Sequence, residues 1–225
     1  MKQQCYFVCA ALVTSIAFFA KAYAQELQHT NKSVWPQNGF ITLGDKIVLG
    51  SAFVSDKERD VITCWHVLDT ARKKHGSTNL FYRSGTNIVA LTIKRELPTK
   101  DIVVFSTSRK LEGEFYPLAN FDKIQVGDPL FFIGYDSRLS TSRIAMLFQT
   151  ATVYSKGPYS FGNIKNDSIM FVADAVKGYS GCAIYTTNRE IVALMSLGYR
   201  TNETIVINGK KERLNAAWSI NPLLK

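Results

Sequence analysis

The protein has 225 residues, of which 46% are hydrophobic, 12% aromatic and 20% charged. This is the composition of an ordinary globular chain, and it excludes a disordered or collagen-like polymer. The formal net charge is +9, but the basic residues are scattered, and the longest uninterrupted basic block is Arg72-Lys73-Lys74. Because such a short block is typical of a solvated helix face, we expect no nucleic acid partner.

The N-terminus has the pattern of a cleavable secretion signal. Lys2 precedes an apolar run from Cys5 to Ala20, and Ala22-Tyr23-Ala24 forms an A-x-A cleavage site. Residues 1–24 are therefore expected to be a signal peptide, whose removal leaves a secreted or periplasmic chain that begins at Gln25. The alternative is an uncleaved membrane anchor. A spanning helix needs about 17 to 25 apolar residues, and the run from Cys5 to Ala20 is shorter than that and is followed by Lys21. We expect no membrane span after cleavage.

Short apolar runs rich in β-branched and aromatic residues recur from Gly39 to the C-terminus, with turn residues between them. This pattern predicts an all-β fold, either a barrel or a sandwich. Eleven or more strands suit two small barrels. The expected strands are Phe40–Leu43, Ile47–Val54, Val61–Cys64, Asn79–Tyr82, Asn87–Ile93, Ile102–Phe105, Pro129–Ile133, Arg143–Val153, Ile169–Val172, Cys182–Tyr185 and Ile191–Ser196.

Helices are expected to be few and short. The best helical stretch in the first half is His66–Lys74, and residues 221–225 have the pattern of a helical turn. Long helices that alternate with strands are missing, which disfavours a parallel α/β fold. The polar stretch 119–127 marks the boundary between an N-terminal barrel, 25–120, and a C-terminal barrel, 121–225.

Cysteine usage excludes a disulfide-rich scaffold. Of four cysteines, Cys5 and Cys9 leave with the signal, so the mature chain keeps only Cys64 and Cys182. No C-x-x-C motif, histidine-rich cluster or nucleotide-binding glycine loop is present, so we expect neither a metal nor another cofactor. The hydrophobic core must therefore hold the fold, and a chain of this length buries enough apolar surface to do so.

Three polar residues flank expected strands in the order histidine, aspartate, serine. His66 follows the apolar run Val61–Cys64, Asp101 opens the run that continues to Phe105, and Ser180 lies in a glycine turn. Each residue taken alone is more often structural than catalytic. Their occurrence together, each at the flank of a strand, is what suggests nucleophilic catalysis.

The chemistry explains why these residue types belong together. A serine hydroxyl is a weak nucleophile at its free pKa, so a neutral imidazole must take its proton. A carboxylate holds that imidazole in the right tautomer and stabilises the imidazolium. The negative oxygen of the tetrahedral intermediate needs backbone N–H donors, and side chains at Gly178 and Gly181 would obstruct that approach or the backbone geometry it requires.

Longer motifs surround these residues. They are Gly50-Ser51-Ala52-Phe53-Val54, Thr63-Cys64-Trp65-His66-Val67, Lys100-Asp101-Ile102-Val103, Gly178-Tyr179-Ser180-Gly181-Cys182, Leu194-Met195-Ser196-Leu197-Gly198 and Ala217-Trp218-Ser219-Ile220. Taken in register, they resemble the chymotrypsin-like serine peptidases, particularly the short bacterial secreted and periplasmic members. The resemblance covers most of the mature chain and implies two six-stranded antiparallel β-barrels with the active site in the cleft between them.

The resemblance also implies a role for each matched residue. Ser180 would be the nucleophile, His66 the general base and acid, and Asp101 the carboxylate that orients the imidazole. The N–H groups of Gly178 and Ser180 would form the oxyanion hole. The side chain of Ser196 would support Asp101.

Substrate recognition follows from the same resemblance. The backbone of Ser196, Leu197 and Gly198 would pair with an extended protein or peptide substrate as an added β-strand. Asp174 lies six residues before Ser180, the spacing at which trypsin-like relatives place a pocket aspartate that binds lysine or arginine. Bacterial relatives also carry a structural aspartate slightly earlier, so Asp174 has two open interpretations.

Three residues depart from the family pattern. Tyr179 stands where many proteolytically activated relatives carry an aspartate that binds a newly formed N-terminus, so activation by such an ion pair is not expected. Cys182 replaces a usual glycine, and Cys64 replaces a usual small residue. If the triad assembles, a disulfide between Cys64 and Cys182 is geometrically plausible in an oxidising compartment, and the alternative is two buried free thiols.

Other functions fit the sequence less well. An α/β-hydrolase needs a G-x-S-x-G motif and the order serine, acid, histidine, and neither is present. The serious rival is a catalytically inactive peptidase-like domain that binds proteins or peptides, but it would gain nothing from keeping His66, Asp101 and Ser180. The sequence therefore predicts a secreted serine endopeptidase that hydrolyses peptide bonds through an acyl-enzyme.

Overall fold

A computed structural model gives the fold of this chain. It describes residues 37–44, 47–85, 87–113, 115–135, 146–173, 178–196, 204–207 and 209–224. The expected signal peptide, together with Asp174, Leu197 and Gly198, lies outside these described residues. Among the helices within them, none combines the length and the apolar character that a membrane crossing requires.

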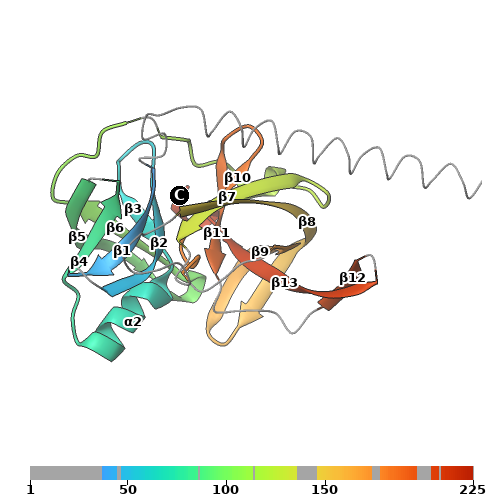
Figure 1. The fold of residues 1–225 in the computed structure, drawn as a ribbon, viewed down its shortest axis with the longest axis horizontal. Coiled ribbons are helices and arrows are strands. Elements are labelled where there is room, and N and C mark those ends of the chain that lie inside the picture. The colour runs from blue at the N-terminus through green and yellow to red at the C-terminus, as the bar shows by residue number, and fades with distance from the viewer. Residues whose placement is uncertain are drawn as a thin grey trace, which may run out of the picture. The chain divides into compact units, whose positions relative to one another are not determined.

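The N-terminal half is a closed antiparallel barrel of six strands in the order β1-β2-β3-β6-β5-β4 (Figure 1). Strand β1 pairs with both β2 and β4, and this closure satisfies both of its edges. The strands are β1 (Asn38–Leu43), β2 (Ile47–Val54), β3 (Val61–Thr63), β4 (Leu80–Ser84), β5 (Asn87–Leu97) and β6 (Ile102–Thr107).

Helix α2 (Trp65–His75) follows β3 directly and covers the barrel. It buries Val67, Leu68 and Ala71, residues spaced three and four apart on one helix face. The helix ends at Gly76, which has a left-handed backbone and donates its N–H to carbonyls of the last turn. The expected helix 66–74 is therefore present, one residue longer at each end.

The C-terminal half is a second closed antiparallel barrel, in the order β11-β10-β7-β8-β9-β13. Pairing of β11 with β13 closes it, and a seventh strand, β12, extends the sheet beyond β13. The strands are β7 (Pro129–Tyr135), β8 (Met146–Phe161), β9 (Ile164–Val172), β10 (Ala183–Thr186), β11 (Ile191–Ser196), β12 (Thr204–Ile207) and β13 (Lys210–Ser219). The predicted all-β fold of two six-stranded antiparallel barrels is thus confirmed.

Short 3-10 helices complete the described elements. They are η1 (Pro98–Lys100), η2 (Phe121–Lys123) and η3 (Asn221–Leu223). The connection between β6 and β7 contains η2, and the expected barrel boundary at residue 120 falls within this connection. The expected C-terminal helical turn corresponds to η3.

Strands of the second barrel differ most from the sequence expectation. Strand β8 continues to Phe161 instead of ending at Val153, and β9 begins at Ile164 instead of Ile169. The extensions pair with each other in a hairpin beyond a register shift near Val153, and much of β8 there is exposed or only half-buried. Because they bury few apolar side chains, the hydrophobic pattern carried no signal for them.

Candidate active site

His66 lies in the first turn of α2, at the point where β3 ends. Strand β3 is buried between β2 and β6. Thr63 Oγ1 donates a hydrogen bond to the Ser51 carbonyl oxygen (2.7 Å), which fixes the end of β3 against β2. The helix that carries His66 therefore starts from a rigid point, and the His66 side chain itself is 28% exposed.

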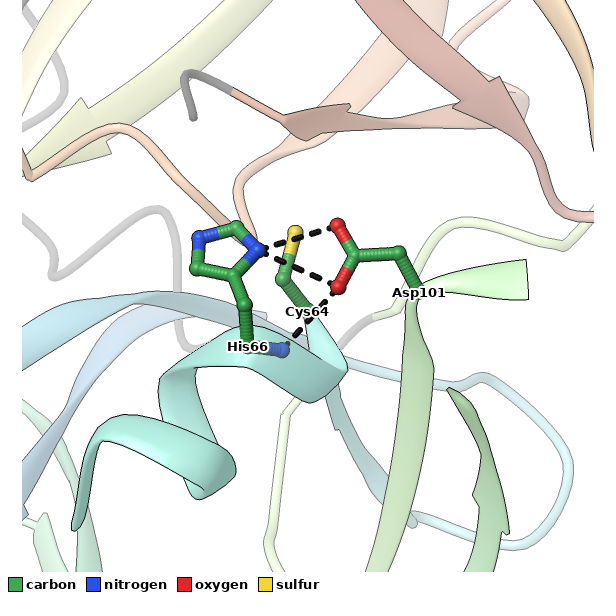
Figure 2. Close-up of side chains that lie close together, drawn as sticks. All are labelled: Cys64, His66 and Asp101. Atoms are coloured by element: carbon green, nitrogen blue, oxygen red, sulfur yellow. Dashed lines mark hydrogen bonds and ion pairs between the residues drawn. The ribbon is translucent and has the colours of Figure 1, made fainter. Parts of the chain in front are cut away.

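Asp101 lies between η1 and β6 and is fully buried. Its backbone is left-handed (φ 54°), a conformation that residues with a Cβ adopt rarely. Two hydrogen bonds hold it there: Asp101 N donates to Pro98 O (3.1 Å), and Trp65 N donates to Asp101 O (3.1 Å). In this conformation the carboxylate faces His66 across the start of α2 (Figure 2).

The Asp101 carboxylate accepts hydrogen bonds from three residues. His66 Nδ1 lies 2.9 Å from Oδ2 and 3.1 Å from Oδ1, and the His66 backbone N donates to Oδ1 at 3.0 Å (Figure 2). Ser196 Oγ (3.0 Å) and Trp218 Nε1 (3.2 Å) both donate to Oδ2. An ionised carboxylate only accepts, so this contact favours the tautomer with hydrogen on Nδ1, in which Nε2 is the unprotonated ring nitrogen.

Ser180 lies in a loop whose backbone is tied to the first barrel through Ser51. The Ser51 N–H donates to the carbonyl oxygens of Gly178 (3.0 Å) and Ser180 (2.8 Å). Ser51 Oγ also donates to Gly178 O (2.7 Å) and accepts from Tyr135 N (2.8 Å). One serine of β2 therefore holds the loop of Ser180 against both barrels.

Ser180 and His66 approach the same point of β2. A Cβ added at Gly50 would lie 2.9 Å from the Ser180 carbonyl oxygen and 2.9 Å from a methyl group of Val67, the residue after His66. Only a glycine allows both elements to come this close to β2. These contacts bring the Ser180 backbone beside the His66 segment, and a hydrogen bond between the two side chains stays a prediction.

Glycines set the backbone of the serine loop. Gly178 and Gly181 have φ values of 110° and 93°, which L residues with a side chain rarely adopt. A Cβ at Gly181 would also collide with the Ser51 carbonyl oxygen and Thr63 Oγ1. Gly181 N donates to the Met195 carbonyl oxygen (2.9 Å), which joins the loop to β11.

Tyr179 anchors the same loop in the second barrel. Its side chain is fully buried and packs edge-on against Phe132, with ring centroids 5.8 Å apart. A Cβ added at Gly134 would approach the Tyr179 ring to 2.7 Å, so the ring lies directly on β7. The Tyr179 hydroxyl accepts a hydrogen bond from Gln149 Nε2 (3.1 Å). A buried aromatic side chain therefore stands at the position where an aspartate was not expected to form an ion pair with the N-terminus.

The cysteines of this region, Cys64 and Cys182, are both fully buried and both free thiols. The structure therefore gives no support to a disulfide between them. Cys64 Sγ donates to the Met195 carbonyl oxygen (3.1 Å). Burial raises the pKa of both thiols, and the nearby Asp101 carboxylate raises the pKa of Cys64 further.

Sequence reasoning missed two residues that shape the site. Ser51 was recognised only as part of a strand motif, and Trp218 only as part of the final strand. A serine after a glycine in β2 carries no sign that its N–H and hydroxyl bind a loop distant in sequence. Trp218 offered a weak signal, because an indole N–H that is buried needs an acceptor.

A family profile for the trypsin-like peptidase domain matches residues 50–194, which is more than half of the chain. The chain belongs to the trypsin-like peptidase domain family. This match includes His66, Asp101 and Ser180 and excludes the final strands. Membership of this family makes the protein a peptidase, which is a class of hydrolase.

Solved structures of several proteases share the fold. The active form of the Rv3671c protease from M. tuberculosis superposes with a TM-score of 0.64 at 16% identity, over 85% of this chain and 79% of that one. The HtrA-type protease AlgW, solved with a tripeptide, gives 0.65 at 17% identity, over 85% and 59%. The MamO protease domain from Magnetospirillum magneticum gives 0.60 at 13% identity, over 86% and 96%. No curated protein matches the chain in sequence.

Proposed function

We propose that this trypsin-like peptidase is a serine endopeptidase that acts outside the cytoplasm, with Ser180 as nucleophile. The observation that carries the proposal is the pairing of His66 Nδ1 with the buried Asp101 carboxylate at 2.9 Å. The donors Ser196 and Trp218 hold that carboxylate in place. A fixed Nδ1–H leaves Nε2 as the base that a serine hydroxyl needs.

In the acylation step, Ser180 Oγ attacks the substrate carbonyl carbon while His66 Nε2 takes the hydroxyl proton. Asp101 stabilises the resulting imidazolium through Nδ1–H. The carbonyl oxygen becomes an oxyanion that accepts hydrogen bonds from the N–H groups of Gly178 and Ser180. Within the described part of the chain, no backbone carbonyl accepts from either N–H, which supports their availability.

The tetrahedral intermediate then collapses. The C–N bond breaks, the leaving amine takes the proton from His66 Nε2, and the acyl group stays on Ser180 Oγ as an ester. A water molecule repeats the sequence in the second half of the reaction, with His66 again as base. The free acid leaves, and Ser180 regains its proton.

Peptide recognition is assigned to the end of β11. Backbone groups of Ser196, Leu197 and Gly198 would pair with an extended substrate, as sheet edges do with added strands. The neighbour AlgW has been solved with a tripeptide and with a decapeptide, which supports a peptide as the substrate of this protein. Asp174 is the candidate for a pocket that binds lysine or arginine side chains.

The remaining parts of the proposal concern organisation and export. Residues 1–24 would direct export and be removed, and the mature chain would need no ion pair at its new N-terminus because Tyr179 anchors the loop. The N-terminal barrel, 25–120, would supply the base and acid, and the C-terminal barrel, 121–225, would supply the nucleophile.

Labelling with a serine-directed fluorophosphonate tests the nucleophile. We expect one label on Ser180 in the folded protein and none in the Ser180→Ala variant. The same substitution should lower turnover of peptides by on the order of 10⁶-fold. A folded protein that neither reacts with the probe nor cleaves peptides would instead be the inactive peptide-binding domain.

Digestion of a mixed proteome tests the substrate class. We expect internal cleavages that are absent with Ser180→Ala. If Asp174 forms the specificity pocket, Asp174→Ala should slow cleavage after lysine and arginine selectively, since the unpaired cation of the substrate then lacks its partner. Unchanged cleavage after these residues assigns Asp174 the structural role.

A further inference from the structure

We propose that Cys64, His66 and Asp101 form a binding site for a thiophilic divalent cation of the zinc class, and that the ion reversibly switches off the peptidase. Binding itself is independent of the proposed function, whereas inhibition rests on it. Figure 2 shows the three side chains converging at the start of α2. Of the three ligand residues, Cys64 is the one that departs from the family pattern.

The positions of the ligand atoms fit one ion. The sulfur of Cys64, a ring nitrogen of His66 and a carboxylate oxygen of Asp101 lie within 4.8 Å of one another. Zinc binds thiolate at about 2.3 Å and nitrogen or oxygen at about 2.0–2.2 Å, so tetrahedral ligands lie roughly 3.5 Å apart. The sulfur must therefore approach by at most about 1.3 Å, and the imidazole and carboxylate must separate by roughly 0.5 Å.

The surroundings of the cluster favour a bound ion. Ser196 Oγ and Trp218 Nε1 donate to Asp101 Oδ2, so the carboxylate keeps its orientation when the imidazole moves. Hydrogen bonds of this kind, one step removed from the metal, typically strengthen binding 10- to 100-fold. Cys64 and Asp101 are fully buried, and the side chain of His66 is 28% exposed. A water molecule as fourth ligand would complete four-coordination.

The donor set selects the class of ion. One sulfur, one imidazole nitrogen and one carboxylate oxygen suit zinc or cadmium, whereas magnesium and calcium prefer oxygen alone. Cys182, the other buried thiol of the described residues, does not belong to the cluster. The two cysteines therefore differ in what they can bind, although burial is the same for both.

Binding changes the protonation of the dyad in a defined way. The Cys64 thiol loses its proton to solvent as the metal–sulfur bond forms. The His66 ring binds through Nδ1, so its proton moves to Nε2, and the Nδ1–H···Asp101 hydrogen bond is replaced by bonds to the metal. One proton is released for each ion. Because Nε2 is then protonated, it cannot accept the Ser180 hydroxyl proton, and catalysis stops.

Cadmium binding to the catalytically silent protein tests the site without using activity. In the Ser180→Ala protein, Cd²⁺ should produce an ultraviolet thiolate-to-cadmium absorption band, release one proton and raise the thermal midpoint. Adding Cys64→Ala should remove the band and weaken binding more than about 100-fold. Cys182→Ala in the same background is the matched control and should leave both unchanged.

The outcomes separate the possible sites. Equal binding with Cys64→Ala, or loss of the band only with Cys182→Ala, would overturn the proposal and assign the ion to another thiol. If Cys64→Ala does not fold, Cys64→Ser keeps the volume and replaces sulfur by a weak ligand, so it should bind Cd²⁺ far less tightly. A Cys64→Ser protein that retains the full affinity contradicts the site equally well.

Inhibition is measured separately on the active protein. Zn²⁺ should lower kcat to the extent that it occupies the site, and a chelator should restore it, while the Cys64→Ala protein should resist Zn²⁺ at the same concentration. If Cd²⁺ binds through Cys64 but the protein has no peptidase activity, the site stands and the proposed function fails. If Zn²⁺ inhibits both proteins equally, inhibition does not occur at this site and the switch is refuted.

Discussion

The two barrels build their halves of the candidate site in different ways. The half carried by the first barrel, His66 and Asp101, is joined by side-chain hydrogen bonds that converge on one buried carboxylate. Two further donors to this carboxylate, Ser196 and Trp218, come from strands β11 and β13 of the second barrel. In the second barrel, the loop of Ser180 is held by its backbone, through carbonyl oxygens bound by Ser51 and glycines with positive φ. The first half therefore depends on chemical groups, and the second half depends on the path of the chain.

This difference predicts opposite sensitivities. An isosteric change that alters only hydrogen bonding should damage the first half severely. An added methyl group, which alters no hydrogen-bonding group, should damage the second half. Each of the following substitutions tests one side of this contrast.

Asp101→Asn should have the largest effect. The amide keeps the shape of the side chain, but it donates as well as accepts and can hold the imidazole in the wrong tautomer. We expect kcat to fall by about 10⁴-fold with little change in KM. Peptide hydrolysis by the purified variant measures this, with thermal unfolding to check that the barrel is intact. A loss below about tenfold would contradict the dependence on one carboxylate.

Gly181→Ala tests the backbone half. Its φ of 93° disfavours a side chain, and the Cβ would meet the Ser51 carbonyl oxygen and Thr63 Oγ1. The loop must shift, and displacement of an oxyanion donor should cost about 10²- to 10³-fold in kcat. Gly162→Ala is the control, since φ is 55° but nothing lies within 4 Å of its Cβ. The argument fails if both alanine variants lose activity equally.

Trp218→Phe removes one donor to the Asp101 carboxylate and keeps most of the packing. The lost hydrogen bond to a charged group should loosen the carboxylate and reduce kcat about tenfold. Trp65→Phe is the matched control, because the Trp65 indole N–H donates to Glu96 Oε2 (2.9 Å) and not to the dyad. Peptidase assays on both variants should separate them, and identical kcat values would show that Trp218 does not position Asp101.

Much of the fold could be predicted from sequence because the barrels repeat a local signal. Buried strands such as β2 and β11 alternate or concentrate apolar residues between turns, and this pattern is readable without the structure. Strand β12 and the outer part of β8 were not predicted, since β12 adds to the edge of the sheet beside β13 and the outer part of β8 buries few side chains. Their partner strands determine them, and the local pattern does not.

The site was predictable only where residue type alone carries the chemistry. His66, Asp101 and Ser180 are recognisable because few other residues can do what they would do. The contribution of Ser51 lies in a backbone N–H that any residue possesses, so its identity gave no clue. The proximity of Cys64 to the dyad likewise depends on how β3 turns into α2, which is a matter of three-dimensional geometry.

Tyr179→Phe should have the smallest effect, and it shows how the backbone half is anchored. The phenyl ring keeps the contacts with Phe132 and Gly134 and loses only the hydroxyl that accepts from Gln149, so stability should fall by about 1 kcal/mol with kcat nearly unchanged. Tyr179→Ala should cost about 3 to 5 kcal/mol, and it should also lower kcat because the loop loses its buried anchor.

Tyr185 is the control: it is equally buried, and its hydroxyl donates to Asn38 Oδ1 (2.8 Å). Tyr185→Ala should destabilise to a similar extent without a specific fall in the kcat of the folded fraction. Equal kcat losses in the two alanine variants would mean that Tyr179 acts only as core, and that the backbone contacts alone hold the loop.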